Sequence, residues 1–373
     1  MQTPWESSFN PLMIQRSHSL TQQHAADLVA LRDSLRPGQR EMADWQGGPL
    51  AVSAVPGAGK SYGLVVAAVM ALAQHQLHRQ RQLVVVTFTR SAAASLKIMI
   101  RERLRTLRLP QGGFGVHTLH GLALNIATRH PELSGLSLGQ TALISPNQSH
   151  RLIRTCVDQW VAENPRLYQG LLAGRSFDGE ETERLRRQSV LRTEVLPALA
   201  QVAIREAKSS GLLPHHLRQL SDQTPDDYAT LAIAAGLYEH YQALLRSRGF
   251  IDYDEMILAA LQVLEDPSAR LLWQNQVFAV FEDEAQDSTP LQTQLLKILA
   301  ENPLQANFPN LVRVGDPNQA INSTFTPADP VFFRQFCQDC YENNKLATMN
   351  QAGRSARIIL EAANFTLDWV NRS

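Results

Sequence analysis

The sequence predicts an α/β protein with a parallel sheet and a large helical insertion. Short apolar runs rich in β-branched residues stand at 49–54, 83–87, 277–281 and 311–314, and each is short enough to be a buried strand. Helical patterns follow most of these runs, which is typical of a parallel sheet with helices on both faces. Between 121 and 267, Leu, Ala, Arg and Gln recur at helical spacing with few strand-like runs, which indicates a helical insertion.

The composition is that of an ordinary globular protein. The chain has 373 residues, 44% of them hydrophobic and 19% charged, and is long enough to bury one or two substantial cores. Its longest apolar stretch, near 64–73, is about half of the ~20 residues that a membrane span needs, and residues 1–20 lack a signal-peptide pattern. The formal net charge is zero and decides nothing about partners. Three cysteines fit a reducing compartment, so we expect a cytoplasmic protein with no membrane partner.

The patterns divide the chain into five parts. Residues 1–33 are a lead-in, and 34–120 and 268–345 are the two parts of one α/β domain. The helical insertion, 121–267, separates these two parts. From 346 to 373 a new unit begins, and an amphipathic helix lies at its end. We therefore expect a chain that stops near the start of a second domain.

The stretch VPGAGKS, at 55–61, has the order strand, tight loop, helix that a phosphate-binding loop needs. Glycines allow the backbone to approach a ligand closely, and backbone N–H groups of three residues are expected to surround a phosphate: Gly57, Ala58 and Gly59. Lys60 is expected to reach the β- and γ-phosphates and Ser61 to hold Mg²⁺. The alternative is a strand-to-helix turn that needs glycine only for packing.

A second motif, VFAVFEDEAQDS at 277–288, is an apolar strand that ends in two acids. Asp283 is expected to bind the Mg²⁺ of a nucleotide on the neighbouring loop, and Glu284 to activate a water molecule as general base. The carboxyl edge of the sheet is where open α/β folds bind ligands. The alternative is a solvated acidic turn, which the combination of both motifs makes unfavourable.

These motifs belong to an ordered series, which in chain order reads LRPGQRE (35–41), VVVTFTRSAAASLK (84–97), VHTLHGLAL (116–124), DEAQD (283–287), VGDPNQAI (314–321) and RSARIILEAAN (354–364). The series resembles the first half of the UvrD/Rep-type superfamily 1 DNA helicases and covers 35–373. The resemblance implies a RecA-like motor domain, interrupted by a helical subdomain, and the start of a truncated second RecA-like domain.

The resemblance also implies site residues. Gln39 corresponds to the family's adenine-reading glutamine, and Gln319 and Arg354 correspond to residues that contact the γ-phosphate. The motifs that contact single-stranded DNA in the family place five residues here: Thr87, Phe88, Thr89, Thr118 and His120.

The sequence departs from the family pattern at several positions. Arg36 replaces an asparagine, and Arg90 and Ser91 replace the family's Asn-Lys pair. Asn322 stands where the family has an aromatic residue that stacks on a DNA base. Gly353 stands where the family has a tyrosine or phenylalanine that covers the adenine.

Three functional classes follow from these observations. The favoured one is an ATP-dependent helicase or translocase that uses ATP and Mg²⁺ and acts on single-stranded DNA and duplex junctions. The resemblance implies 3′-to-5′ movement and a role in repair or replication restart. It also implies a partner, the missing second motor domain, without which hydrolysis is expected to be weak. The alternatives are a nucleotide-dependent DNA-binding or regulatory module without unwinding activity, and a phosphate-loop enzyme with a small-molecule acceptor.

Two further patterns are interpreted as structural. Cys337 and Cys340 have the spacing of metal ligands, but with one other cysteine in the chain they are expected to be ordinary thiols on a helix. The basic run ERLRRQSVLR (183–192) is expected to be a solvated helix face.

Overall fold

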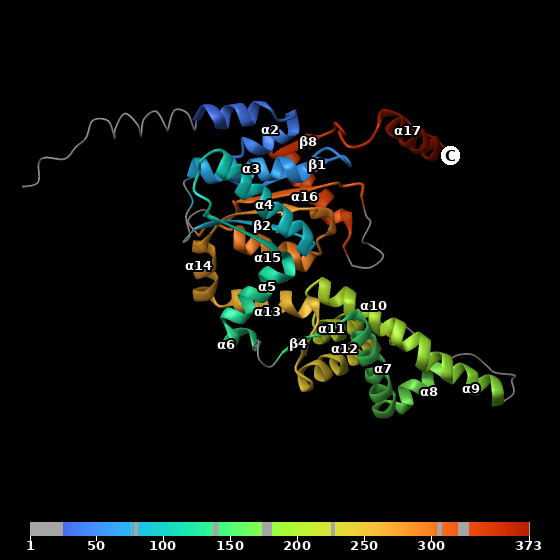
Figure 1. Ribbon diagram of the computed structural model, residues 1–373. Coiled ribbons are helices and arrows are strands. Elements are labelled where there is room, and N and C mark those ends of the chain that lie inside the picture. Colours follow the sequence, from blue (N-terminus) through green and yellow to red (C-terminus); the bar gives the residue numbers. More distant parts are fainter. Residues whose placement is uncertain are drawn as a thin grey trace, which may run out of the picture.

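A sheet of six parallel strands lies at the centre of the fold, in the order β3-β2-β6-β7-β1-β8 (Figure 1). The computed structural model describes residues 25–75, 77, 81–136, 141–173, 181–224, 228–303, 308–319 and 328–372. The strands are β1 (Leu50–Ala54), β2 (Gln82–Thr87), β3 (Phe114–Thr118), β6 (Val277–Asp283), β7 (Leu311–Gly315) and β8 (Leu346–Met349). Because all six run the same way, their carboxyl ends meet at one edge of the sheet.

This sheet confirms the predicted α/β fold class. β1, β2, β6 and β7 coincide with the four apolar runs of the sequence. β3 and β8 are not among the predicted strands. They are the two edge strands of the sheet. An edge strand has one neighbour and less apolar surface to bury, so β3 (FGVHT) and β8 (LATM) lack a long apolar run.

Both faces of the sheet are buried, each in its own core. Along β2, Leu83 and Val85 belong to one core, and Val84 and Val86 belong to the other, as expected for successive side chains on a strand. Helices of the first core are α2 (Pro37–Ala43), α3 (Lys60–His75) and α4 (Arg90–Thr106). Helices of the second core are α5 (Leu119–Arg129), α13 (Tyr253–Glu265), α14 (Pro267–Gln276), α15 (Pro290–Ala300) and α16 (Pro330–Glu342).

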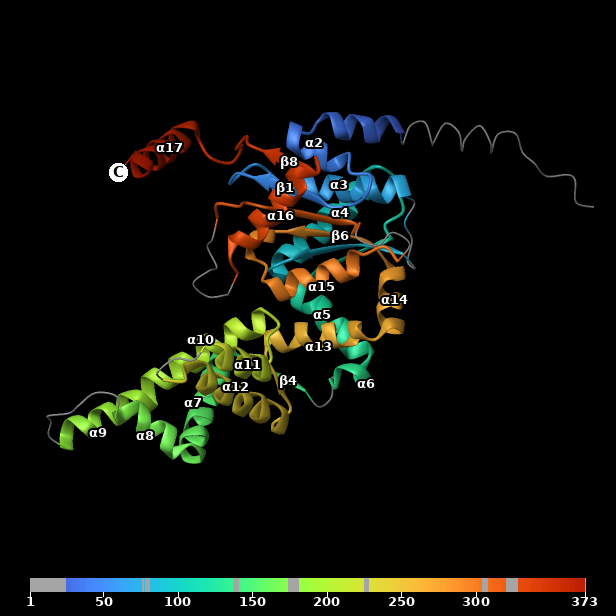
Figure 2. The ribbon, with the colours of Figure 1, turned by 180° about the vertical axis from the view of Figure 1, so that it is seen from behind.

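The helical insertion forms a separate body beside the sheet domain (Figures 1 and 2). Its elements are α7 (Pro146–Glu163), α8 (Pro165–Ala173), α9 (Glu181–Val190), a π-helical turn (Leu191–Val195), α10 (Leu196–Ser209), α11 (Pro214–Gln223) and α12 (Thr230–Ser247), with the short pair β4 (Ala142–Leu143) and β5 (Phe250–Ile251). A third core, from Ile144 to Leu245, holds this body together. The bounds 121–267 stay a prediction, since α5 and α13 inside them pack in the core of the sheet domain.

Lys208 joins the insertion to the sheet domain. This lysine on α10 is 1% exposed, and its Nζ lies 2.7 Å from carboxylate oxygens of Asp252 and Glu255 at the start of α13. The Tyr241 ring centroid lies 5.0 Å from Nζ. Burial acts to lower the pKa of Lys208, but the two carboxylates outweigh it and the pKa is raised. The lysine therefore stays charged and holds α10 against α13.

A buried ion pair joins two central strands. Glu282 of β6 and Arg313 of β7 face each other in register, each 1% exposed, and Arg313 Nε donates to Glu282 Oε2. Arg313 Nη2 also donates to Thr293 Oγ1 at 3.1 Å, and Ser288 Oγ donates to Glu282 Oε1. Glu282 directly precedes Asp283, so the pair fixes the end of β6 that carries the predicted acids.

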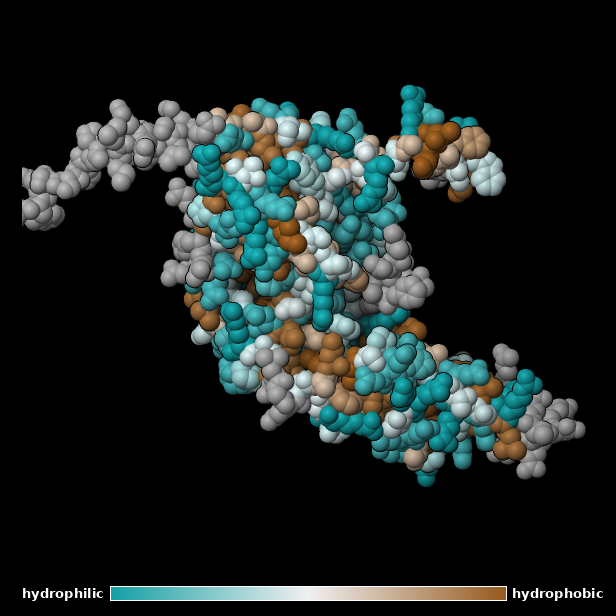
Figure 3. All heavy atoms as spheres, in the orientation of Figure 1, coloured by the Kyte–Doolittle hydropathy of each residue, from teal (hydrophilic) through white to brown (hydrophobic). Residues whose placement is uncertain are grey.

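After β8, the chain crosses the carboxyl edge of the sheet and ends in α17 (Arg357–Arg372), which confirms the predicted amphipathic helix. Figures 1 and 3 show α17 standing away from the sheet domain with apolar side chains on its surface; Ile358 and Phe365 are each 74% exposed. No described helix combines the length and apolar character that crossing a bilayer requires.

Replacing both members of the buried ion pair is expected to cost far less than replacing one. The substitution Arg313→Met leaves the Glu282 carboxylate buried and unpaired, so it should lower the free energy of unfolding by about 3–5 kcal/mol. The double variant Glu282→Met and Arg313→Met should lie within about 1 kcal/mol of the unsubstituted protein. Urea unfolding measures both changes. A double variant as unstable as Arg313→Met alone would contradict this account.

Asp254 is expected to make stability depend on pH. Burial, and then the Asp252 carboxylate, raise the pKa of Asp254 from 3.8 to about 6. The folded protein therefore holds this proton between those values, and stability is lost as the pH rises through them. Asp254→Asn should raise the free energy of unfolding by about 3 kcal/mol at pH 8 and about half of that at pH 5. Urea unfolding at both values tests this; a gain equal at both, or equal to that of the exposed control Asp222→Asn, would refute it.

Candidate functional site

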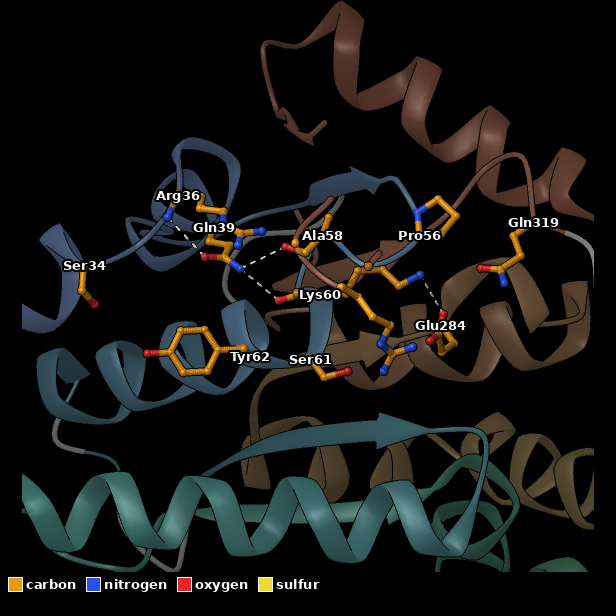
Figure 4. A pocket seen from close by; sticks show the side chains of 14 residues that line it. Ser34, Arg36, Gln39, Pro56, Ala58, Lys60, Ser61, Tyr62, Glu284 and Gln319 are labelled. Carbon is orange, nitrogen blue, oxygen red and sulfur yellow. Dashed lines mark hydrogen bonds and ion pairs between the residues drawn. The ribbon is translucent and has the colours of Figure 1, made fainter. Parts of the chain in front are cut away.

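The loop after β1 has the backbone of a phosphate-binding loop. Gly57 and Gly59 have φ angles of 75° and 84°, a region that glycine adopts freely. Ala58 N–H donates to the Val55 carbonyl at 3.1 Å, which closes the turn, and α3 starts at Lys60. The first turn of a 16-residue helix therefore points at the space above the loop (Figure 4).

Two contacts connect this loop and helix to the end of β6. Ser61 Oγ donates to Asp283 Oδ2 at 3.0 Å, and Lys60 Nζ lies 3.2 Å from Glu284 Oε2. In sequence the two motifs are 222 positions apart. The fold thus brings together the basic, hydroxyl and acidic groups that the two motifs were predicted to combine.

Asp283 has the features of a cation ligand. Its Oδ1 is buried and has no hydrogen-bond partner among the described residues. Burial, and then the Glu284 carboxylate, raise the pKa of Asp283 to about 6, while the Ser61 hydroxyl acts against this. A divalent cation would satisfy the free oxygen and favour the ionised form. No group of three His, Cys, Asp or Glu side chains in the described part of the chain is placed to hold a metal ion by itself. Mg²⁺ in nucleotide sites is commonly held by one or two protein ligands together with phosphate and water oxygens.

Glu284 is held in an unusual backbone conformation. Its φ angle is 58°, in the left-handed region that residues other than glycine rarely adopt. Gln286 Nε2 donates to Glu284 Oε2 at 3.0 Å, and Gln286 Oε1 accepts from Asp316 N–H at 3.0 Å. A Cβ at Gly315 would lie 2.6 Å from that Oε1, so glycine is required there. Sequence reasoning assigned no role to Gln286, although it stands within the quoted DEAQD motif.

A cavity of about 620 Å³ lies beside the loop, and Lys60, Ser61, Glu284, Gln319 and Arg354 all line it (Figure 4). These residues come from four separate segments of the chain. Both residues that were predicted to contact a γ-phosphate therefore face the same space as the loop.

The segment that follows β8 lies directly on the phosphate loop. Gly353 N–H donates to the Gly57 carbonyl at 2.9 Å, and a Cβ at Gly57 would lie 3.0 Å from the Cβ of Arg354. Arg354 is thereby placed over the loop. Arg354 also lines the cavity.

Gln39 is buried and connects α2 to the phosphate loop. Its Nε2 donates to the carbonyls of Ala58 at 3.2 Å and Gly59 at 3.1 Å, and its Oε1 accepts from Arg36 N–H at 3.2 Å. Both amide hydrogens are thus taken by the loop. One acceptor position of Oε1 remains for a ligand.

The residues predicted to bind DNA lie at the same edge of the sheet but outside the cavity. Thr87 ends β2 and is 3% exposed, and Phe88, next to it, is 37% exposed. Thr89 and Thr118 cap α4 and α5, because each side chain accepts a backbone N–H at 3.1 Å, from Ala92 and Gly121. The two threonines therefore have a structural role irrespective of any ligand.

His120 is partly buried between three helices. Burial lowers its pKa, so the ring is neutral near pH 7. The ring lies edge to face with Tyr253 at 5.0 Å between centroids, and its Nε2 is 3.5 Å from Gln292 Nε2. His120 thus connects α5 to α13 and α15.

Three other residues that the sequence singled out are Asn322, Cys337 and Cys340. Asn322 lies outside the described residues. Cys337 and Cys340 are buried on α16, and burial raises the pKa of each thiol, to about 12 and about 11.

Two residues that sequence reasoning did not assign, Arg36 and Tyr62, also line the cavity. Arg36 stands in the quoted motif at 35–41, which was the available signal.

Comparison with known proteins agrees with this geometry. Three similar proteins are the ATP-dependent DNA helicases PcrA of Bacillus subtilis (strain 168), 25% identical over 336 residues, Rep of Escherichia coli (strain K12), 25% identical over 334 residues, and UvrD1 of Mycobacterium tuberculosis (strain ATCC 25618 / H37Rv), 28% identical over 338 residues. These matches cover 90%, 89% and 90% of this chain but 39%, 43% and 39% of the relatives. The chain therefore spans about two fifths of the length of these relatives.

The family match is broader than any single motif. Residues 35–341 match the UvrD/REP helicase N-terminal domain, which includes the phosphate loop, the whole helical insertion and the acidic strand end. The chain therefore belongs to the UvrD/REP helicase N-terminal domain family.

Proposed function

We propose that this chain binds and hydrolyses ATP as the first motor domain of a DNA helicase or translocase. One observation carries the proposal: Ser61 and Lys60 of the phosphate loop contact Asp283 and Glu284, beside a cavity large enough for a nucleotide that Lys60, Ser61 and Glu284 line. The relatives are named ATP-dependent DNA helicases, which supports the choice of ATP and DNA.

In the proposed mechanism, Lys60 changes partner. Without nucleotide its ammonium pairs with Glu284 at 3.2 Å. Phosphates that enter the loop offer Lys60 a stronger negative charge, which frees the Glu284 carboxylate to accept a proton from water. Gln286 keeps hold of the carboxylate through its 3.0 Å hydrogen bond. Ion-pair exchange would thus connect nucleotide binding to activation of the base.

The other site residues would act on the phosphates. Ser61 and Asp283 would hold Mg²⁺, which when bound neutralises phosphate charge. Gln319 and Arg354 would contact the γ-phosphate, one from the end of the described segment after β7 and the other from the segment after β8. Loss of the γ-phosphate would then remove a contact from each of these two segments.

The DNA path would run over the ends of β2 and β3. Phe88 is exposed there, beside the capped starts of α4 and α5. Since β6 lies directly beside β2 in the sheet, DNA over the end of β2 would lie next to the acidic end of β6. We extend the proposal to 3′-to-5′ movement on single-stranded DNA at duplex junctions, in repair or replication restart, with a second motor domain as partner; the family resemblance supports this extension.

Removal of the general base is expected to separate binding from hydrolysis. Glu284→Gln keeps a hydrogen-bond acceptor for Gln286 but loses the charge, so ATP turnover should fall about 100-fold or more. Binding of Mg·ATP should be equal or tighter, because the carboxylate no longer competes for Lys60. Phosphate release and calorimetry measure the two effects. Unchanged turnover, with the exposed control Glu342→Gln equally active, would refute the role of Glu284.

The DNA path predicts a selective loss on truncation of Phe88. Phe88→Ala removes an exposed aromatic face, and since stacking on one base contributes about 1–3 kcal/mol, affinity for oligothymidylate should fall about tenfold or more. Nucleotide affinity should not change. The matched control is Phe308→Ala. Phe308 is 42% exposed and lies just before β7 begins, at the amino ends of the strands. Fluorescence anisotropy measures DNA affinity, and equal effects of both variants would contradict the proposed path.

A nucleotide affinity that does not change when DNA is added would favour the alternative function, a regulatory module without unwinding activity.

A further inference from the structure

Arg36 and Gly353 form one wall of the cavity in an arrangement that depends on both residues. A Cβ built on Gly353 would lie 2.3 Å from Nη2 and 2.8 Å from Cζ of Arg36. The guanidinium therefore occupies the space that any side chain at position 353 would need. Arg36 Nη1 donates to the Gln351 carbonyl at 3.1 Å, which holds the group there.

The position of this wall relative to the phosphate loop indicates what it faces. Arg354 lies over Gly57 of the loop, and the neighbouring residue, Gly353, meets Arg36. In Figure 4, Arg36 lies at the end of the cavity away from Glu284 and Gln319. A nucleotide with its phosphates in the loop has its nucleoside beyond them, so the guanidinium lies on the nucleoside side of the cavity.

Tyr62 supplies an aromatic ring to the same cavity. It stands in the first turn of α3, directly after Ser61, and its ring lines the cavity with Arg36 and Gln39. Arg103 lies 5.4 Å from the ring centroid, and its Nη2 is 3.5 Å from the hydroxyl, which fixes the ring. In Figure 4, Arg36 and Tyr62 appear above and below the Gln39 amide.

We infer that the Arg36 guanidinium and the Tyr62 ring form a slot that stacks on the nucleobase of the bound nucleotide. The inference rests on the proposed function, because it assumes phosphates in the loop. Both groups offer flat faces, and a guanidinium stacks on aromatic systems where a lysine ammonium does not. The remaining acceptor position of Gln39 Oε1 suits the amino group of adenine and not the carbonyl oxygen of guanine. The slot therefore favours adenine nucleotides.

Arg36→Ala tests this inference with two probes, the analogue AMPPNP and inorganic tripolyphosphate, each titrated with Mg²⁺ into the whole chain by calorimetry. Loss of the stacking face should weaken AMPPNP binding about tenfold and change tripolyphosphate binding less than about twofold. Arg36→Lys keeps the charge without the plane and should lose as much AMPPNP affinity as Arg36→Ala. Arg105→Ala, an exposed arginine on α4 outside the cavity, is the matched control and should change neither.

Two outcomes would overturn the slot. Equal weakening of both probes would assign Arg36 to the phosphates, and no weakening of either would show that Arg36 does not touch the ligand. Failure of the proposed function gives another pattern, in which the unsubstituted chain binds neither probe. Lys60→Ala serves as the reference for that pattern, since it should weaken both probes together.

A second pair of variants tests the dependence of Arg36 on Gly353. Arg36→Asn should lose AMPPNP affinity, and adding Gly353→Tyr to that variant should restore it, because the ring then fills the vacated space. A double variant as weak as Arg36→Asn would contradict the exchange of a guanidinium for a ring.

Discussion

The hydrogen bond from Ser61 to Asp283 is the contact on which the proposed nucleotide site depends, because it fixes the phosphate loop against the acidic end of β6. β7 lies between β1 and β6, so their carboxyl ends are held at a set separation. The buried pair of Glu282 and Arg313 fastens β6 to β7 just below the site. Any loss of register between these strands would move Asp283 away from the loop.

A second electrostatic contact joins the insertion to the sheet domain. Lys208 is fully enclosed, and its two carboxylate partners stand at the start of α13, which packs in the core of the sheet domain. A buried ammonium with two acceptors holds one geometry, since any displacement leaves a charge unpaired in the protein interior. The insertion is therefore positioned by charge at its base and by its own apolar core elsewhere.

The sequence was sufficient to predict the central strands and the phosphate loop, and the reason is physical. A strand buried on both faces needs a continuous apolar run, such as LVVV in β2 and VFAVF in β6, whereas the edge strands β3 and β8 need no such run. The loop needs glycines at 57 and 59, which a sequence displays directly. Contacts between distant segments leave no local pattern: nothing in the sequence alone showed that Gln286 binds Asp316, or that Arg36 fills the space above Gly353.

The central claim is that Asp283 and Ser61 receive the cation of a bound nucleotide. Calorimetric titration of the chain with ATP, in Mg²⁺ and then in EDTA, tests it most directly when repeated on Asp283→Ala. The account predicts that Mg²⁺ tightens ATP binding about tenfold or more in the unsubstituted chain, and that Asp283→Ala binds ATP equally with and without the ion. Equal affinity with and without Mg²⁺ in the unsubstituted chain would contradict the account.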